Sequence, residues 1–108
     1  MNYSVYTIPP FDKQLKRLAK KFPSFKKDFS DFLLTLKEKP DQGIPLGNNC
    51  FKIRIAISSK GRGKSGGARI VTHLKITQSK IYLLSIYDKS EQDDIPNLDK
   101  PKPNKVIM

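Results

Sequence analysis

The spacing of apolar and polar positions changes several times along the chain. Residues 2–8 are rich in β-branched and aromatic side chains and stop at two prolines, which predicts a short first strand. From Phe11 onward the apolar residues recur at helical spacing, and the same spacing returns after Pro23 and ends before Pro40. The pattern predicts two amphipathic helices that pair antiparallel across a two-residue break.

The second half of the chain has the two-residue period of strands. Apolar residues alternate with Lys52 and Arg54 over residues 51–58, so one face is apolar and the other carries two neighbouring cations. Residues 68–76 and 80–87 predict two further strands joined by a hairpin turn, and so short a turn requires antiparallel pairing. Residues 40–50 are turn-rich and predict a connection that leads into the strands.

These elements predict an α+β fold in the order β-α-α-β-β-β. Two antiparallel helices would pack on one face of a small, mainly antiparallel sheet, forming a two-layer sandwich with the other face open. The chain has 108 residues, of which 37% are hydrophobic, enough for one core. We expect a single domain over residues 1–95 and a loosely ordered tail over residues 96–108, where three prolines prevent a long helix.

Several classes of protein are excluded at this stage. No apolar run reaches the ~20 residues of a membrane span, and the N-terminus lacks the charge order of a signal peptide. We therefore expect a soluble cytoplasmic protein without a membrane partner. With one cysteine and one histidine, the chain offers neither an internal disulfide nor the usual Cys/His zinc site, and no cofactor or metal is expected.

Positive charge is the strongest bulk feature of the sequence. Lys and Arg number 21 against 10 Asp and Glu, for a net charge of +11. Residues 1–87 carry +12, whereas residues 88–108 carry −1. A basic body of this kind favours a polyanionic or acidic protein partner over a merely lysine-rich surface. Charge alone does not separate DNA from RNA.

Residues 58–67 form a glycine-rich basic loop. Gly63-Lys64-Ser65 resembles part of an ATP-binding phosphate loop, but Ser58 stands where that motif needs glycine, and a strand follows instead of a helix. The ATP-binding motif is therefore excluded. Cations are spaced along this flexible loop so that they can contact a nucleic-acid backbone: Lys60, Arg62 and Lys64. The alternative is a solvated hairpin loop that uses glycine for positive φ.

The strands carry the other candidate residues. Antiparallel pairing would bring Arg69 across from Lys52 and Arg54 at one end of the open face. Mutual repulsion in such a cluster favours a bound anion, and the cluster can neutralise a phosphorane-like transition state. Tyr87 could stack on a base near the same rim. Lys89 could stabilise charge, or act as a base if neighbouring cations lower its pKa.

His73 and Cys50 complete the set of residues with chemical potential. His73 follows Arg69 by four residues, so both are expected on one sheet face. A lone strand histidine is more often structural than catalytic, and without a second histidine as acid or base we assign His73 to RNA binding. Cys50 has no obvious base in the sequence and is predicted to be an inert core thiol.

The element order and three segments resemble the RelE/ParE toxin superfamily. The segments are Phe51-Lys52-Ile53-Arg54, the glycine-rich residues 61–70, and residues 81–91, which contain Tyr87-Asp88-Lys89-Ser90-Glu91. A Gly-Lys-Ser-Gly-Gly stretch followed by a Tyr-x-Lys-x-Glu pattern is most similar to the HigB-type, RelE-like branch. The resemblance covers about residues 3–95.

This resemblance implies the toxin of a bacterial type II toxin–antitoxin module. Such a toxin is an endoribonuclease that enters the ribosomal A site and cuts mRNA by metal-independent attack of a 2′-hydroxyl on the adjacent phosphate. The implied catalytic residues are Lys52, Arg54, Arg69, Tyr87 and Lys89. Arg69 and Lys52 would stabilise the transition state, Tyr87 would stack on a base, and Lys89 would act as acid or base. The loop cations would hold ribosomal or messenger RNA.

The resemblance also implies partners and leaves alternatives open. A cognate antitoxin, often a HigA-like helix-turn-helix protein in HigB-type modules, would mask the basic face. ParE relatives with the same fold inhibit DNA gyrase and are not nucleases, so a gyrase inhibitor would keep its toxicity when the strand cations are lost. A third alternative is a basic RNA-binding module without activity. Pro96 shortens the C-terminal helix often expected in the family, so no catalytic contribution is expected beyond Lys89.

Overall fold

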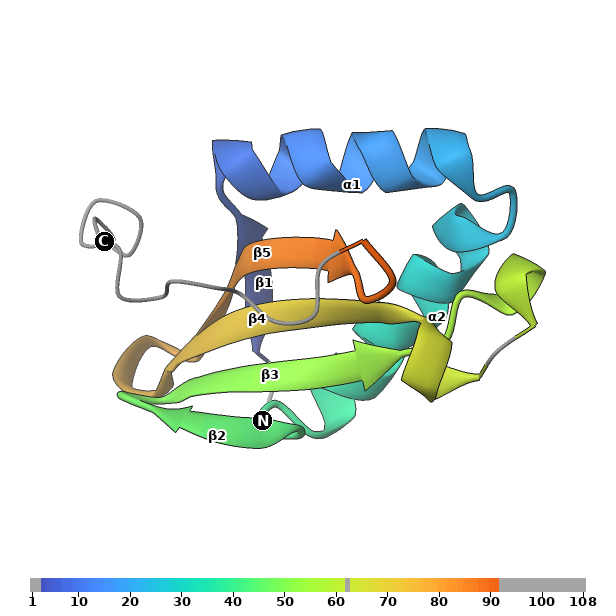
Figure 1. Ribbon diagram of the computed structural model, residues 1–108. Coiled ribbons are helices and arrows are strands. Elements are labelled where there is room, and N and C mark those ends of the chain that lie inside the picture. The colour runs from blue at the N-terminus through green and yellow to red at the C-terminus, as the bar shows by residue number, and fades with distance from the viewer. Residues whose placement is uncertain (1–2, 62, 92–108) are drawn as a thin grey trace.

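The computed structural model describes residues 3–61 and 63–91 (Figure 1). Arg62 and the predicted tail over residues 96–108 lie outside these residues. Within the described ranges, no helix combines the length and the apolar character needed to cross a membrane.

Two helices follow the first strand. Helix α1 spans Pro9–Lys21 and begins with two prolines, which a first helical turn tolerates because its N–H groups have no partner inside the helix. Helix α2 spans Phe25–Glu38 and ends two residues before Pro40, whose ring disfavours helix at Lys39. Each helix buries one apolar stripe, which includes Phe11 and Leu18 in α1 and Phe25, Phe32 and Leu36 in α2.

Five strands form one mixed sheet in the order β1-β5-β4-β3-β2. Their bounds are Ser4–Thr7 for β1, Ile44–Gly47 for β2, Cys50–Ile55 for β3, Ala68–Lys75 for β4 and Lys80–Asp88 for β5. Strand β1 runs parallel to β5, and the other neighbours are antiparallel.

Strand β2 corrects the prediction that residues 40–50 form only a turn-rich connection. Asn48 and Asn49 both adopt positive φ, the conformation of a tight hairpin turn, and this turn folds β2 back against β3. Pro45 is tolerated because β2 is an edge strand. A four-residue strand that contains Pro and Gly has no alternating pattern, so the sequence alone did not indicate it.

Both helices cover the same face of the sheet (Figure 1). The core between the layers joins the helix stripes to Ile53 of β3, Ile70 of β4 and Ile81 of β5, all buried. The predicted two-layer α+β architecture is therefore confirmed. The opposite side of the sheet is called the helix-free face below.

A bulge in β5 decides which of its side chains reach the helix-free face. Two adjacent residues of β4 pair with Leu83 and Ser85, so Leu84 is an extra residue in β5. Tyr87 lies five positions after Tyr82. In a regular strand, side chains that are an odd number of positions apart point to opposite faces. The bulge brings both tyrosines to the helix-free face.

Candidate nucleic-acid interface

The strand register brings the predicted strand residues together. Arg54 of β3 lies directly opposite Arg69 of β4, which lies directly opposite Tyr87 of β5. Lys52 is two residues from Arg54 and therefore shares its face. The antiparallel pairing predicted from the short turn between β4 and β5 is confirmed, and β3 is also antiparallel to β4. These four positions lie at one end of the helix-free face.

The described strand residues of the helix-free face include cations but no carboxylates. Asp88 is the one acidic residue in the described strands, and its side chain lies on the helix side, where it pairs with Lys21 of α1. The basic residues whose strand positions place them on the helix-free face are Lys52, Arg54, Arg69, Lys75 and Lys80. An anionic ligand would offset the repulsion among such charges.

Three cations line one shallow hollow where β2 begins. Lys52, Arg54 and Lys64 surround a volume of about 270 Å³, together with Gln42, Gly43, Ile44 and Ile53. Within the described part of the chain, no acidic side chain lines it. A neighbouring hollow of about 200 Å³ shares Arg54 and Lys64 but is also lined by Asp28 and Asp31. The carboxylate-free hollow is thus the better place for a phosphate.

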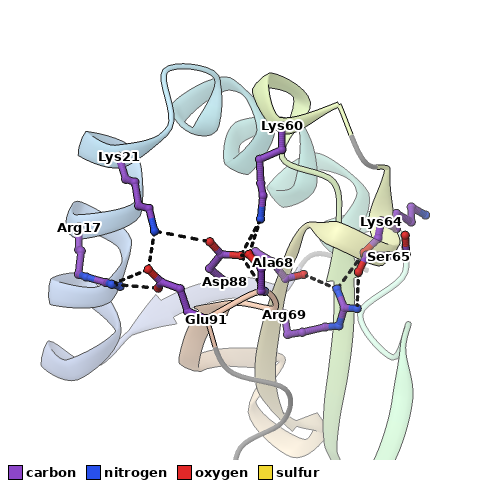
Figure 2. Close-up of polar contacts among 10 residues, drawn as sticks. Arg17, Lys21, Lys60, Lys64, Ser65, Ala68, Arg69, Asp88 and Glu91 are labelled. Atoms are coloured by element: carbon purple, nitrogen blue, oxygen red, sulfur yellow. Dashed lines mark hydrogen bonds and ion pairs between the residues drawn. The ribbon is translucent and has the colours of Figure 1, made fainter.

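The side chain of Arg69 is buried, although the sequence suggested that it is exposed. Its strand position is on the helix-free face, as predicted, but its side chain is only 4% exposed, so the expectation of an exposed cation there is wrong. Nη1 donates to the carbonyl oxygen of Lys64 at 2.9 Å, and Nη2 donates to that of Ser65 at 3.4 Å (Figure 2). Arg69 therefore holds the loop that carries Lys64.

Tyr87 and Lys89 lie at the end of β5. Tyr87 is only 7% exposed, so its ring offers little surface to a base, and this burial does not support the predicted stacking role. Lys89 is half-buried, and its backbone N–H donates to the carbonyl of Gly67 at 3.0 Å. That contact places Lys89 beside the start of β4. Its role as acid or base stays a prediction.

Lys60 is not a free loop cation. Its Nζ donates to Asp88 Oδ1 at 2.9 Å and to Ser90 Oγ at 2.8 Å, and its side chain is 14% exposed (Figure 2). Burial by itself raises the pKa of the Asp88 carboxyl, but the hydrogen bonds from Lys60 and Ser90 outweigh it and hold that pKa below its ordinary value. Lys60 thus ties the loop to the end of β5, and we do not retain it as an RNA contact.

A second carboxylate extends this ion-pair cluster to α1. Arg17 Nη2 donates to Glu91 Oε1 at 2.9 Å, and Lys21 Nζ also donates to Glu91 (Figure 2). The hydrogen bond from Lys21, followed by that from Arg17, lowers the pKa of Glu91. The charges of Arg17 and Lys21 are therefore partly compensated within the molecule.

The described part of the glycine-rich loop is anchored rather than free. It forms two short 3₁₀ turns, Ser58–Lys60 and Lys64–Gly66. Asp28 of α2 accepts hydrogen bonds from the Ser58 N–H at 2.8 Å and from its hydroxyl at 2.6 Å. Gly67 is required for packing, because a Cβ there would lie 2.0 Å from the Ile55 carbonyl oxygen. Of the predicted loop cations, the structure describes Lys64 as an exposed side chain that lines the hollow.

Cys50 has a neighbour that the sequence did not reveal. It lies opposite His73 in the β3–β4 register, and its Sγ is 3.4 Å from His73 Nδ1. Both side chains are half-buried on the helix-free face, so the prediction of a core thiol is wrong. Burial raises the pKa of the Cys50 thiol, which therefore remains protonated at neutral pH. His73 shares the face of Arg69, as predicted.

The described residues contain no group of three or more His, Cys, Asp and Glu side chains that could hold a metal ion. What the helix-free face offers to a ligand is positive charge from Lys and Arg, which suits phosphate groups.

Comparisons with known proteins bear on the fold. No protein-family model matches the chain. The chain is similar to the structure of an E. coli toxin RelE mutant in the free state, with a TM-score of 0.62 and 14% sequence identity, covering 86% of this chain and 90% of that one. It is also similar to the solution structure of the conserved hypothetical protein HP0892 from Helicobacter pylori, with a TM-score of 0.49 and 18% identity, covering 82% and 97%. The chain therefore has the fold of RelE, as its sequence predicted.

Proposed function

We propose that this protein is the toxin of a type II toxin–antitoxin module and that it cleaves mRNA in the ribosomal A site. One observation supports the proposal: on a RelE-like fold, Lys52, Arg54 and Lys64 line one hollow, and no carboxylate is among the described residues that line it. A phosphate of the RNA backbone fits the charge of this hollow. The basic face suits a ribosomal substrate, whose surface is largely polyanionic.

Cleavage without a metal needs positive charge at the phosphate. The 2′-oxygen attacks the adjacent phosphorus, the bond to the 5′-oxygen breaks, and the products are a 2′,3′-cyclic phosphate and a 5′-hydroxyl. Negative charge grows on the phosphoryl oxygens during this step. Arg54, which is exposed and can form a bidentate contact, and Lys52 are placed to stabilise it.

The proposal assigns different roles to the remaining residues. Arg54 is proposed to stabilise the transition state, the role that the sequence suggested for Arg69. The buried Arg69 instead holds the loop and so positions Lys64. Lys89 is proposed to move a proton, either from the 2′-hydroxyl or to the 5′-oxygen. The proposed cognate antitoxin would mask the helix-free face, and carboxylates would complement its charge.

Expression in a bacterial host followed by primer extension on abundant transcripts tests this proposal. We expect discrete, translation-dependent cuts inside coding regions. Arg54→Ala should reduce cleavage roughly 10²–10³-fold, as is usual when one oriented charge donor is lost. Lys26→Ala removes the same charge from an exposed site on α2 and should cleave like the wild type.

Other outcomes would contradict the nuclease. Growth arrest with intact messages and inhibited DNA supercoiling would identify a gyrase inhibitor. Arg54→Ala would then remain toxic. Absence of growth arrest, together with RNA binding by the purified protein, would identify a binding module without activity.

A further inference from the structure

A row of aromatic rings crosses the helix-free face away from the cationic hollow. Tyr6 of β1 pairs in register with Tyr82 of β5, which pairs with His73 of β4. The ring centroids of Tyr6 and Tyr82 are 5.6 Å apart, and those of Tyr82 and His73 are 6.5 Å apart. Three adjacent strands thus place three rings side by side.

These rings do not belong to the core. Tyr6 is 42% exposed, and Tyr82 and His73 are half-buried, whereas the core cluster lies on the other face of the sheet. Cross-strand aromatic pairs stabilise a sheet by only about 0.2–1 kcal/mol. Sheet stability alone therefore gives a weak reason to keep three rings at the surface.

Cations border the aromatic row. Lys80 Nζ lies 5.2 Å from the centre of the Tyr6 ring, and Lys75 pairs with Lys80 in the β4–β5 register. No carboxylate occurs among the described strand residues of this face, because Asp88 lies on the helix side. Flat rings flanked by cations match a ligand whose aromatic groups alternate with negative charges.

We propose that Tyr6, Tyr82 and His73 form a platform on which unpaired bases of a single RNA strand stack. The proposal extends the proposed function and rests on it only in taking RNA as the ligand. The distance along β5 from Tyr82 to Tyr87 corresponds to about four regular strand residues, or roughly 13 Å. The distance along β4 from His73 to Arg69 is the same. A short single strand can therefore reach from the hollow to the platform. Lys75 and Lys80 would contact its phosphates, as basic residues do beside stacking aromatics on RNA-binding sheets.

Fluorescence anisotropy with a short labelled single-stranded RNA tests the platform. Tyr6→Ala and Tyr82→Ala should each weaken binding roughly tenfold, because one base loses its stacking partner. Tyr6→Phe and Tyr82→Phe keep the ring and should bind like the wild type. The slope of log K against log salt should not change, since no charge is lost. A duplex of the same sequence should not respond to these variants, because its bases are already stacked.

Several results would overturn the platform. The wild-type protein could fail to bind the single strand. The alanine variants could bind it normally while melting at the wild-type temperature. The phenylalanine variants could bind as weakly as the alanine variants. Alanine variants that bind RNA normally but escape neutralisation by the antitoxin would instead make the row a protein-docking surface. Ring-dependent RNA binding without cleavage in cells would refute the nuclease and leave the platform standing.

Discussion

Arg54 and Arg69 face each other across two strands but have different surroundings. Arg54 is exposed beside the hollow, whereas the guanidinium of Arg69 is buried and donates to loop carbonyl oxygens. A planar guanidinium presents its donors on separate nitrogen atoms in a fixed fork, and a lysine, whose donors share one nitrogen, does not reproduce this geometry. The same residue type thus serves a ligand at one position and the loop at the other.

Replacing Arg69 should therefore lower stability. We expect Arg69→Ala to reduce the free energy of unfolding by about 2 kcal/mol, the range for hydrogen bonds made by a charged group, and Arg69→Lys to recover little of it. Urea denaturation measures both. Arg54→Ala is the matched control and should unfold like the wild type within about 0.5 kcal/mol. An Arg69→Ala protein with unchanged stability would show that these bonds do not support the fold.

Thr72 is a buried residue whose hydroxyl group should lower the stability of the protein. It is fully buried on the helix side of β4, and among the described residues its Oγ1 finds no hydrogen-bond partner. Thr72→Val keeps the shape and removes the unsatisfied hydroxyl, so we expect the free energy of unfolding to rise by about 1 kcal/mol. Thr35→Val is the contrast, because the Thr35 hydroxyl donates to the Phe32 carbonyl at 2.8 Å and its loss should bring no gain. Destabilisation by Thr72→Val would imply a bonded hydroxyl.

The ion-pair cluster connects three elements that lie far apart in the sequence. Lys21 comes from α1, Lys60 from the loop after β3, and Asp88 from the end of β5 (Figure 2). Asp88 is 1% exposed, and its charge is compensated by these neighbours. The cluster fixes the loop relative to the sheet, and with it the approach to the hollow.

Acid should weaken this connection. The pKa of Asp88 is lower in the folded protein than its unfolded value of about 3.9, so its contribution is complete above that value. The contribution is lost as the pH falls through the folded pKa. The free energy of unfolding should therefore drop as the pH is lowered from about 5, with a shallower slope in Asp88→Asn.

At pH 7 the same variant should be less stable by about 2 kcal/mol, because Lys60 loses its ionic partner. Denaturant titrations across this pH range provide the measurement. Asp31→Asn is the control, since Asp31 is 61% exposed and its ion pair with Lys27 lies at the surface. Equal pH slopes for wild type and Asp88→Asn would refute the role of the buried carboxylate.

At the scale of the whole molecule, the sheet separates two kinds of surface. Its helix side is apolar, and its other side presents cations and aromatic rings. A further basic surface runs along α1, where a hollow of about 450 Å³ is lined by Lys13, Lys16, Arg17, Lys20 and Lys21. Glu91 compensates two of these charges, so we place the phosphate site on the sheet.

Salt should reveal which cations contact RNA. The Lys52→Ala/Lys64→Ala double variant should reduce the slope of log K against log salt by about 0.7 per lysine lost, because each contact releases counterions from a single strand. A double variant of Lys13 and Lys26 has the same net charge and should keep the wild-type slope if α1 and α2 do not contact the strand. Equal slopes for all three proteins would place the RNA elsewhere.

Features that depend on neighbours along the chain could be predicted from the sequence. Helical spacing predicted the buried stripes of the two helices, and the short turn between β4 and β5 required these two strands to pair antiparallel. The two-residue period placed Lys52 and Arg54 on one face before any partner was known.

Features that depend on contacts between distant residues could be seen only in the folded structure. The fifth strand β2, the bulge at Leu84 and the burial of Arg69 arise from pairing and packing across the sheet. Lys60 was expected to face solvent because its partner Asp88 lies 28 residues away, and Cys50 seemed isolated because His73 lies 23 residues away. The sequence gives the charge and size of each side chain. The group that neutralises its charge or buries it is determined only when the strands pair and the helices pack on the sheet.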